Sequence, residues 1–369
     1  MPSPGPAHRD RKDERGDEEE EETGALDPAT VDSLLSSPRA VAGVVELGSR
    51  SFQVSERALV MGVANRTPDS FYDKGSYFAF DRFLSHCDRL VGEGADVLDV
   101  GGVKAGPGDE VGEAEELERV VPAVEALTSR FDVPVSVDTW RASVAREAFE
   151  AGAVVGNDIS GFADASYLEV AALAGASVVA THIRLAPRVR DPDPPYEDVV
   201  EAVTTRLVEL GARAEAAGIP ARRVIVDAGL DLGKTTAHSI ELLAASSRLA
   251  ALGYPLLLSA SNKTFLGETL DLAVGERRDA SLAAAAIGIA GGCRILRVHD
   301  VAGTVRVRDL LAAILAAGEA ETSEPEEPRS APEPGGVATG AVAPTGAVAP
   351  TGVVAPTGGV TTGARGRRS

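Results

Sequence analysis

Eight short apolar segments rich in β-branched residues, each followed by a longer stretch of helical period, dominate residues 41–317. A short apolar run predicts a buried strand, and an Ala-, Leu-, Glu- and Arg-rich stretch of period 3.6 predicts an amphipathic helix. The predicted strands are residues 58–63, 96–100, 133–137, 153–157, 176–181, 223–227, 255–259 and 293–298. The predicted helices are residues 80–93, 114–129, 141–150, 165–174, 197–217, 237–251, 280–291 and 303–317.

This alternation predicts the α/β class and a (β/α)8 TIM barrel over residues 41–317. Residues Val41 to Val54 precede the first strand and are predicted to form a hairpin. A doubly wound open sheet is the competing fold. It usually has fewer strands and a Gly-x-Gly-x-x-Gly turn after the first one, and the first turn of this chain lacks that motif.

The two ends of the chain differ from the middle in composition. Residues 1–40 are charged and Pro-rich, with an acidic block from Asp17 to Glu22. Residues 318–369 repeat Gly-Ala-Val-Ala-Pro-Thr at 340–345 and 346–351. Residues 1–40 cannot bury enough apolar surface to offset the entropy lost on folding, so we expect a disordered acidic head. A proline in every repeat blocks regular strand pairing, so we also expect a disordered tail. A partner-binding tail is the alternative.

The net charge of −20 excludes one broad class of function. A strongly acidic protein repels the phosphate backbone, so we expect no nucleic-acid partner. The sequence has neither a run of eighteen apolar residues nor a secretory signal, which predicts a cytoplasmic protein with no membrane partner. Its two cysteines, Cys87 and Cys293, lie in apolar surroundings and are predicted to be free, buried thiols.

Lysine and asparagine are scarce, and their positions are informative. The chain has five lysines and three asparagines, and all except Lys12 follow predicted strands. In a (β/α)8 barrel those loops form the active-site face. The set comprises Asn65, Lys74, Lys104, Asn157, Lys234, Asn262 and Lys263. A functional face therefore competes with the simpler explanation that loops favour polar residues.

Four polar residues at strand ends suggest particular ligands. Asn65 offers a carbonyl oxygen of the kind that Mg²⁺ prefers, although Thr-Pro-Asp-Ser after it is also good turn chemistry. Asp138, Asn157 and Asp227 end the third, fourth and sixth predicted strands. Buried carboxylates are costly unless they are paired, and the amino-pyrimidinone edge of a pterin offers paired donors. Capping of the following helices is the alternative.

Arg297 and His299 alternate along the eighth predicted strand, so both side chains are expected to point inward. Loops after strands seven and eight are the usual phosphate site of this barrel, and a diphosphate would satisfy both side chains. The alternative is an internal salt bridge to Asp300 or Asp69.

Taken in order, these motifs resemble the dihydropteroate synthase family over roughly residues 58–316. The resemblance rests on Asn65 to Phe71, Asp99 to Gly102, Ser136 to Thr139, Asn157-Asp158, Gly233 to Thr235 and Arg297 to Val301. It implies that the chain condenses 6-hydroxymethyl-7,8-dihydropterin pyrophosphate with p-aminobenzoate as a transferase of folate biosynthesis, and that it forms a homodimer, with Ala-rich residues 281–290 at the interface.

The resemblance also implies roles for individual residues. Asp138, Asn157, Asp227 and Lys263 would bind the pterin, while Asn65, Arg297 and His299 would bind the pyrophosphate. Asn65 would also bind Mg²⁺, and the catalytic residues would be Asp138, Lys263, Arg297 and His299.

The chain departs from the family where the second substrate is expected. The family's Glu-Ser-Thr-Arg after the second strand is Val103-Lys104-Ala105-Gly106, and its Gly-Phe-Gly-Phe-Gly-Lys is Gly229 to Lys234, without either aromatic. Its Met-His-Met is Thr181-His182-Ile183. Such changes resemble those in a second actinobacterial copy of the family.

Three functions follow from this pattern: a slow synthase, an enzyme that uses another nucleophile, or a non-catalytic pterin-binding protein with an interaction or regulatory role. A corrinoid-dependent methyltransferase fits less well, because it has no use for Arg297 and His299 at a diphosphate. A sugar-phosphate enzyme fits less well still, because it has no use for the three strand-end carboxylates of Asp138, Asp158 and Asp227.

Overall fold

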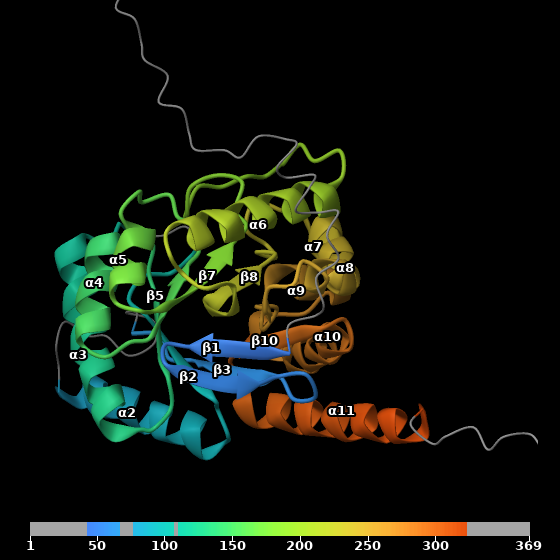
Figure 1. The fold of residues 1–369 in the computed structure, drawn as a ribbon, viewed down its shortest axis with the longest axis horizontal. Coiled ribbons are helices and arrows are strands. Elements are labelled where there is room, and N and C mark those ends of the chain that lie inside the picture. The colour runs from blue at the N-terminus through green and yellow to red at the C-terminus, as the bar shows by residue number, and fades with distance from the viewer. Residues whose placement is uncertain (1–42, 67–76, 107–109, 323–369) are drawn as a thin grey trace, which may run out of the picture. The chain divides into compact units, whose positions relative to one another are not determined.

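The computed structural model describes residues 43–66, 77–106 and 110–322. Within these ranges, the side chains of residues 77–78 and 318–322 are not described. Its centre is a closed parallel barrel with the strand order β10-β3-β4-β5-β6-β7-β8-β9 (Figure 1). The barrel strands are β3 (Leu59–Val63), β4 (Val97–Gly101), β5 (Val135–Asp138), β6 (Val155–Asp158), β7 (Ser177–Thr181), β8 (Val224–Asp227), β9 (Leu256–Leu258) and β10 (Cys293–Val298). The predicted (β/α)8 barrel is confirmed.

Helices surround this barrel on its outer side (Figure 1). They are α2 (Tyr77–Gly92), α3 (Glu113–Arg130), α4 (Ala142–Glu150), α5 (Tyr167–Leu173), α6 (Val199–Ala216), α7 (Thr236–Ala244), α8 (Ser246–Ala250), α9 (Thr264–Leu270), α10 (Arg278–Ala290) and α11 (Val301–Thr322), with 3-10 turns at Ala221–Arg223 and Val274–Glu276. The helix after β9 was predicted at 280–291 alone. The structure adds α9 before it, which is too short for its period to stand out in the sequence.

Local sequence explains where several helices begin. Asp198 precedes α6, and its side chain accepts a hydrogen bond from the Glu201 amide. Thr235 precedes α7 and forms a reciprocal capping box with His238. Each cap satisfies an amide that has no partner within its own helix, so the loop residue fixes where the helix starts.

Two apolar layers hold the barrel together. Outward-facing strand residues pack against the helices, and inward-facing residues fill the interior. The interior layer consists of Leu59, Met61, Val97, Val155, Val179, Ile225, Leu257 and Ile295. The barrel is therefore a packed core, and ligands are expected at its carboxyl end.

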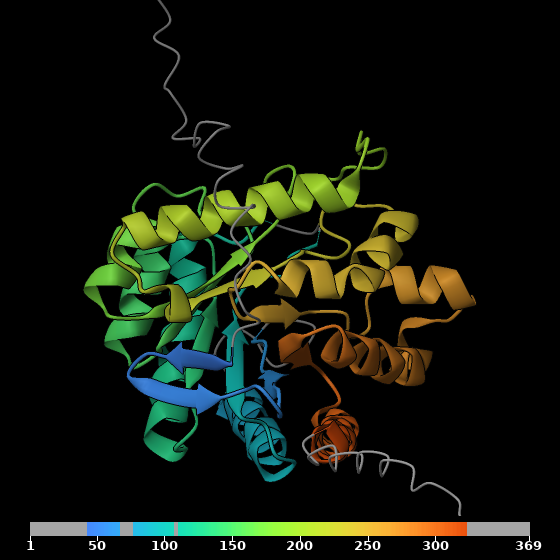
Figure 2. The same ribbon diagram turned by 45° about the vertical axis from the view of Figure 1, so that its right-hand side comes forward.

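A hairpin of β1 (Val44–Leu47) and β2 (Arg50–Gln53) closes the other end of the barrel (Figure 2). Val45, Leu47 and Val54 join the interior apolar cluster. The Ser177 hydroxyl donates to the Glu46 carbonyl at 2.7 Å, which ties the hairpin to β7. The predicted hairpin is confirmed, apart from Val41 and Ala42, which lie outside the described residues.

Helix α11 continues to Thr322, beyond the predicted limit of the last helix at residue 317. The rest of the proposed tail and the whole head of residues 1–40 lie outside the described residues, so their predicted disorder stays a prediction. Cys87 and Cys293 are both free and buried, as expected. Among the described helices, none is long and apolar enough to cross a membrane.

Candidate functional site

The polar residues predicted at the strand ends form one ring at the carboxyl end of the barrel. Strand register places Asp138 beside Asn157, and Thr181 beside Asp227. Because side chains alternate along a strand, residues two positions beyond an interior apolar residue also point inward. The relation links Val97 to Asp99, Val155 to Asn157, Val179 to Thr181, Ile225 to Asp227 and Ile295 to Arg297.

Arg297 lies at the centre of this ring and bridges two carboxylates. Its Nε donates to Asp99 Oδ2 at 2.7 Å, and its Nη2 donates to Asp138 Oδ2 at 2.7 Å. The Asn157 side-chain amide donates to the same Asp99 oxygen at 3.2 Å. Sequence reasoning considered a salt bridge from Arg297 to Asp300 or Asp69. The structure instead pairs Arg297 with Asp99 and Asp138, and Asp300 with Arg278.

The ring is buried and negatively charged overall, and both properties raise the pKa of Asp138. Burial raises the pKa of Asp138 to about 7; the positive charge of Arg297 opposes the rise, and the negative charge of Asp99 adds to it. Arg297 keeps its charge, because its two carboxylate partners raise its pKa against the effect of burial. Perturbed carboxylates in a polar barrel mouth are typical of functional sites.

Asp227 and Lys263 form the opposite side of the ring. Asp227 accepts a hydrogen bond from the Gly229 amide at 2.8 Å, and burial raises its pKa. Lys263 lies between β9 and α9, where its Nζ donates to the Leu230 carbonyl. Burial lowers the pKa of Lys263, and the nearby charge of Asp227 opposes that change. The structure therefore places these two residues together, although their role in pterin binding stays a prediction.

Asn65 meets one requirement of a magnesium ligand. Its Oδ1 is buried and has no hydrogen-bond partner among the described atoms. Gly101 lies beside it, since a Cβ on Gly101 would sit 2.8 Å from that oxygen and 3.5 Å from Asp138 Oδ2. An unpaired carbonyl oxygen suits Mg²⁺, which usually takes one or two protein ligands and completes its shell with water and phosphate oxygens. The described residues contain no cluster of three His, Cys, Asp or Glu side chains that would hold a metal without such help.

His299 lies on the exposed rim rather than in the ring. Its Nδ1 is 3.0 Å from the Ser261 hydroxyl, which also accepts a hydrogen bond from the His299 amide at 3.2 Å. These contacts leave Nε2 as the ring nitrogen that no described hydrogen bond uses. The motif that begins at Asn65 is described only as far as Arg66, so Asp69 and Lys74 lie outside the described residues.

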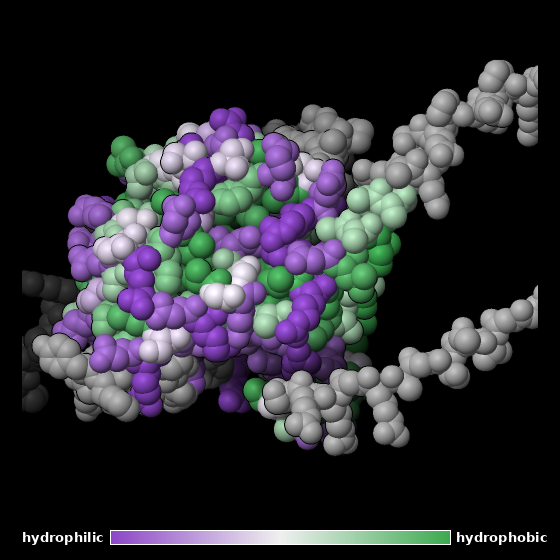
Figure 3. All heavy atoms as spheres, turned by 90° about the horizontal axis from the view of Figure 1, so that it is seen from below, coloured by the Kyte–Doolittle hydropathy of each residue, from purple (hydrophilic) through white to green (hydrophobic). Residues whose placement is uncertain are grey.

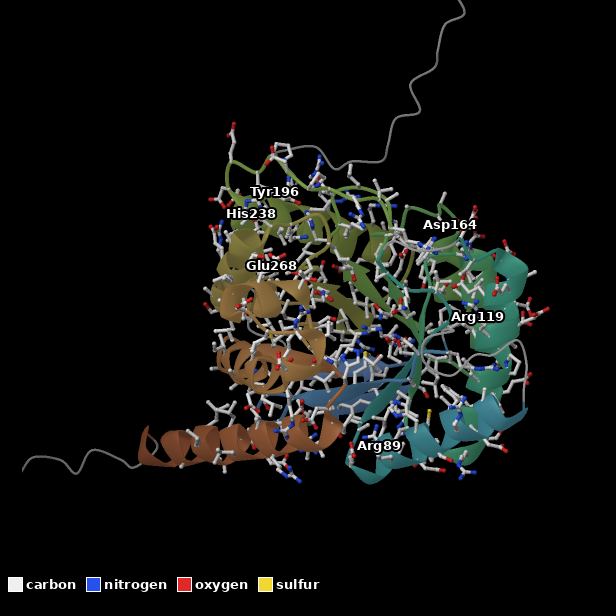
Figure 4. All side chains as sticks on the ribbon, turned by 180° about the vertical axis from the view of Figure 1, so that it is seen from behind. Arg89, Arg119, Asp164, Tyr196, His238 and Glu268 are labelled. Carbon is white, nitrogen blue, oxygen red and sulfur yellow. The ribbon has the colours of Figure 1, made fainter. Side chains whose placement is uncertain are left out.

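Sequence reasoning missed a buried pair on the loops after β7 and β8. Lys234 Nζ lies 2.9 Å from His182 Nδ1 and donates to the carbonyls of His182 and Leu232. Burial lowers the pKa of Lys234 to about 7 and that of His182 to about 3. The His182 ring faces Tyr196, which contacts His238 edge-on with centroids 5.2 Å apart (Figure 4). The sequence analysis placed Lys234 and His182 in separate loop motifs and did not pair them, because they lie 52 residues apart in the chain.

Two buried residues of α3 that sequence reasoning also missed hold neighbouring loops: Glu116 holds the loop after β5, and Arg119 holds the start of the second loop. Glu116 of α3 is fully buried, accepts a hydrogen bond from the Thr139 hydroxyl at 2.6 Å, and pairs with Arg141. Arg119, on the same helix (Figure 4), donates to the Gly102 carbonyl at 2.6 Å. This hydrogen bond fixes the backbone at the start of the loop from Gly102 to Gly106, but the loop itself contains no arginine.

Comparison with known proteins agrees with this geometry. The model of the pterin binding enzyme family matches residues 61–299. An inactive dihydropteroate synthase 2 of Mycobacterium leprae (strain TN) is 46% identical over 266 residues, covering 70% of this chain and 91% of that protein.

The chain belongs to the dihydropteroate synthase family.

Relatives named as dihydropteroate synthases without that qualifier are also similar. The dihydropteroate synthase of Bacillus subtilis (strain 168) is 38% identical, covering 74% of this chain and 95% of that protein. The crystal structure of Yersinia pestis dihydropteroate synthase in a sulfonamide drug complex is 38% identical with a TM-score of 0.69, covering 74% of this chain and 99% of that one. The fold and the family are therefore shared both with a relative named as an inactive synthase and with relatives named simply as synthases.

Proposed function

We propose that this protein is a dihydropteroate synthase paralogue that binds a dihydropterin pyrophosphate but does not condense it with p-aminobenzoate. One observation carries the proposal. The inward ring keeps Asp138, Asn157, Asp227 and Lys263 in one place, whereas the loops on the second-substrate side lack the family's arginine and aromatics. The similar mycobacterial proteins named as inactive synthases support the same conclusion.

The ring suits the edge of a pterin. Asp138 and Asp227 would accept its N–H groups, and Asn157 supplies both a donor and an acceptor. Arg297 uses only Oδ2 of Asp138, and a carboxylate can accept several hydrogen bonds, so the pterin could bind Asp138 while Arg297 keeps its position.

Arg297, His299 and Asn65 would hold the pyrophosphate. Arg297 would supply charge, and His299 would donate a hydrogen bond from Nε2. Mg²⁺, when bound at Asn65, would supply electrostatic stabilisation of the pyrophosphate oxygens.

Synthesis of dihydropteroate is the second candidate function, and the retained Asp138, Lys263 and Arg297 favour it.

Calorimetry and a product assay separate the two candidates. The full chain is titrated with dihydropterin pyrophosphate and Mg²⁺, and then incubated with p-aminobenzoate while dihydropteroate and pyrophosphate are measured. Saturable binding without dihydropteroate is the expected result. Dihydropteroate formation at a rate within tenfold of an active synthase would contradict the non-catalytic proposal. Absence of pterin binding would contradict both candidates. The Asp227→Asn variant serves as the control for binding at the ring.

We also propose a cytoplasmic homodimer. Apolar side chains on α10 and α11 are exposed, among them Ile287 at 52%, Leu310 at 63% and Ile314 at 55%. The barrel seen from below shows green apolar surface at the right-hand edge (Figure 3). Contiguous exposed apolar surface is a feature of protein interfaces. A monomer mass in light scattering would remove the dimer proposal.

A further inference from the structure

The loop after β8 binds the start of α9 through one carboxylate. Asp231 accepts hydrogen bonds from the amides of Thr264 and Phe265, the latter at 3.3 Å. The Ser239 hydroxyl of α7 donates to the same side chain at 3.3 Å. Asp231 has a φ of 65°, a left-handed conformation that only Gly, Asn and Asp adopt readily. The carboxylate is therefore fixed in position by two helices and by its own backbone.

This carboxylate lies beside Lys263. The Lys263 side chain donates to the carbonyl of Leu230, the residue before Asp231, and the Lys263 main chain leads directly into the amide that Asp231 accepts. The charge of Asp231 opposes the lowering of the Lys263 pKa by burial, after the larger opposing effect of Asp227. It acts on Lys234 in the same direction. The formal charges of this group of four residues, Lys234, Lys263, Asp227 and Asp231, sum to zero. Removal of the Asp231 charge would therefore leave one positive charge in excess.

In the family motif a glycine stands at the position of Asp231, between two phenylalanines that the resemblance implies lie beside the second substrate; this chain has Leu230 and Leu232 instead. The opposite loop, from Gly102 to Gly106, has no arginine. A carboxylate has thus been added and a guanidinium lost around one part of the site. The amides of Thr264 and Phe265 are already used by Asp231, so they are not available to a carboxylate on a ligand.

We propose that Asp231 makes the second-ligand side of this site select an uncharged aromatic amine over an amine that carries a carboxylate. The inference rests on the proposed pterin site, because the second ligand is taken to bind beside an occupied ring. It adds the chemical class of that ligand. It also predicts that p-aminobenzoate, an anion at neutral pH, is the weaker partner, because a like charge about 8 Å away changes the affinity of an ion by roughly tenfold in a partly hydrated site.

The test compares p-aminobenzoate with its uncharged analogue p-aminobenzamide. The full chain is first saturated with dihydropterin pyrophosphate and Mg²⁺, and that binding is recorded separately. Each amine is then titrated by calorimetry. The wild-type chain is expected to bind the amide about tenfold more tightly than the acid. Asp231→Asn, which tolerates the left-handed backbone and keeps an acceptor for the two amides, is expected to reduce that preference by about tenfold.

Asp271→Asn is the matched control. Asp271 also has a left-handed backbone, with a φ of 54°, and it is exposed at the other end of α9, roughly 10 Å along the helix axis. It removes the same formal charge and is expected to leave the preference unchanged.

Four results would overturn the proposal: tighter binding of the acid by the wild-type chain, an unchanged preference in Asp231→Asn, an equal change in Asp271→Asn, or binding of the pterin with neither amine. Failure of the pterin titration itself would instead refute the proposed function.

Discussion

Replacement of Asp138 by asparagine tests whether the ring is built for a ligand at the expense of stability. Asp138 and Asp99 are buried and share Arg297, so the three groups carry a net charge of −1. Burial raises the pKa of Asp138 to about 7, against about 4 in an unfolded chain. The folded protein therefore binds more protons than the unfolded chain between these values. The contribution of Asp138 to stability is full below about pH 4 and is lost as the pH rises through 7.

The size of the effect follows from this shift. One pKa unit corresponds to about 1.4 kcal/mol, so three units set an upper limit of about 4 kcal/mol. Local relaxation and entry of water reduce the penalty of a buried ion, which leaves an expected effect of about 2 kcal/mol. Asparagine has nearly the same shape but cannot ionise. Asp138→Asn should therefore match the wild-type stability at pH 4 and exceed it by about 2 kcal/mol at pH 8.

Urea denaturation of both proteins between pH 4 and pH 8 measures this difference. Taking the difference removes contributions from other groups, such as Asp158, whose pKa is raised to about 6. The exposed Asp271→Asn variant controls for the loss of one formal charge. In parallel, the variant should bind dihydropterin pyrophosphate at least tenfold more weakly, since an acceptor becomes a donor. A stability difference that does not vary with pH would refute the reasoning, and so would unchanged pterin binding.

Three further substitutions test the structure around the site. Gly229→Ala should lower the free energy of unfolding by about 3 kcal/mol, because its Cβ would lie 2.0 Å from the His182 carbonyl oxygen at a φ of 63°. Thermal denaturation measures this, and Gly106→Ala, which meets nothing within 4 Å, should change little. Lys234→Met should cost about 3 kcal/mol in urea, because a buried imidazole nitrogen and two carbonyls lose their donor; a neutral result would mean that water replaces the ammonium. Glu116→Gln should cost about 2 kcal/mol by weakening its buried ion pair with Arg141, and an unchanged urea midpoint would show that the buried charge is not needed there.

The sequence by itself determined the architecture and placed Asp138, Asn157, Asp227 and Arg297 at the mouth of the barrel. It did not predict Asp99 in the ring, and it predicted an inward His299 that the structure places on the exposed rim. Eight apolar runs separated by helical stretches permit few arrangements, because parallel strands need helical crossovers and a buried sheet must be covered. The alternation of side chains along each strand then decided that Asp138, Asn157 and Asp227 point into the mouth of the barrel. These features can be predicted because they depend on the periodicity of apolar and polar residues along the chain, which does not require knowledge of distant contacts.

The tertiary structure alone decided which polar groups meet. Arg297 and Asp99 are 198 residues apart in the chain, and closure of the barrel between β10 and β3 brings their strands together. The pairing of Lys234 with His182 and of Asp231 with α9 likewise depends on how neighbouring loops pack. A polar side chain could form hydrogen bonds with several different groups, and only the strand register and the closure of the barrel determine which of them it meets. The motifs and their family resemblance therefore suggested a pterin site, whereas the preference that we propose for its second ligand depends on how charges meet in the folded chain.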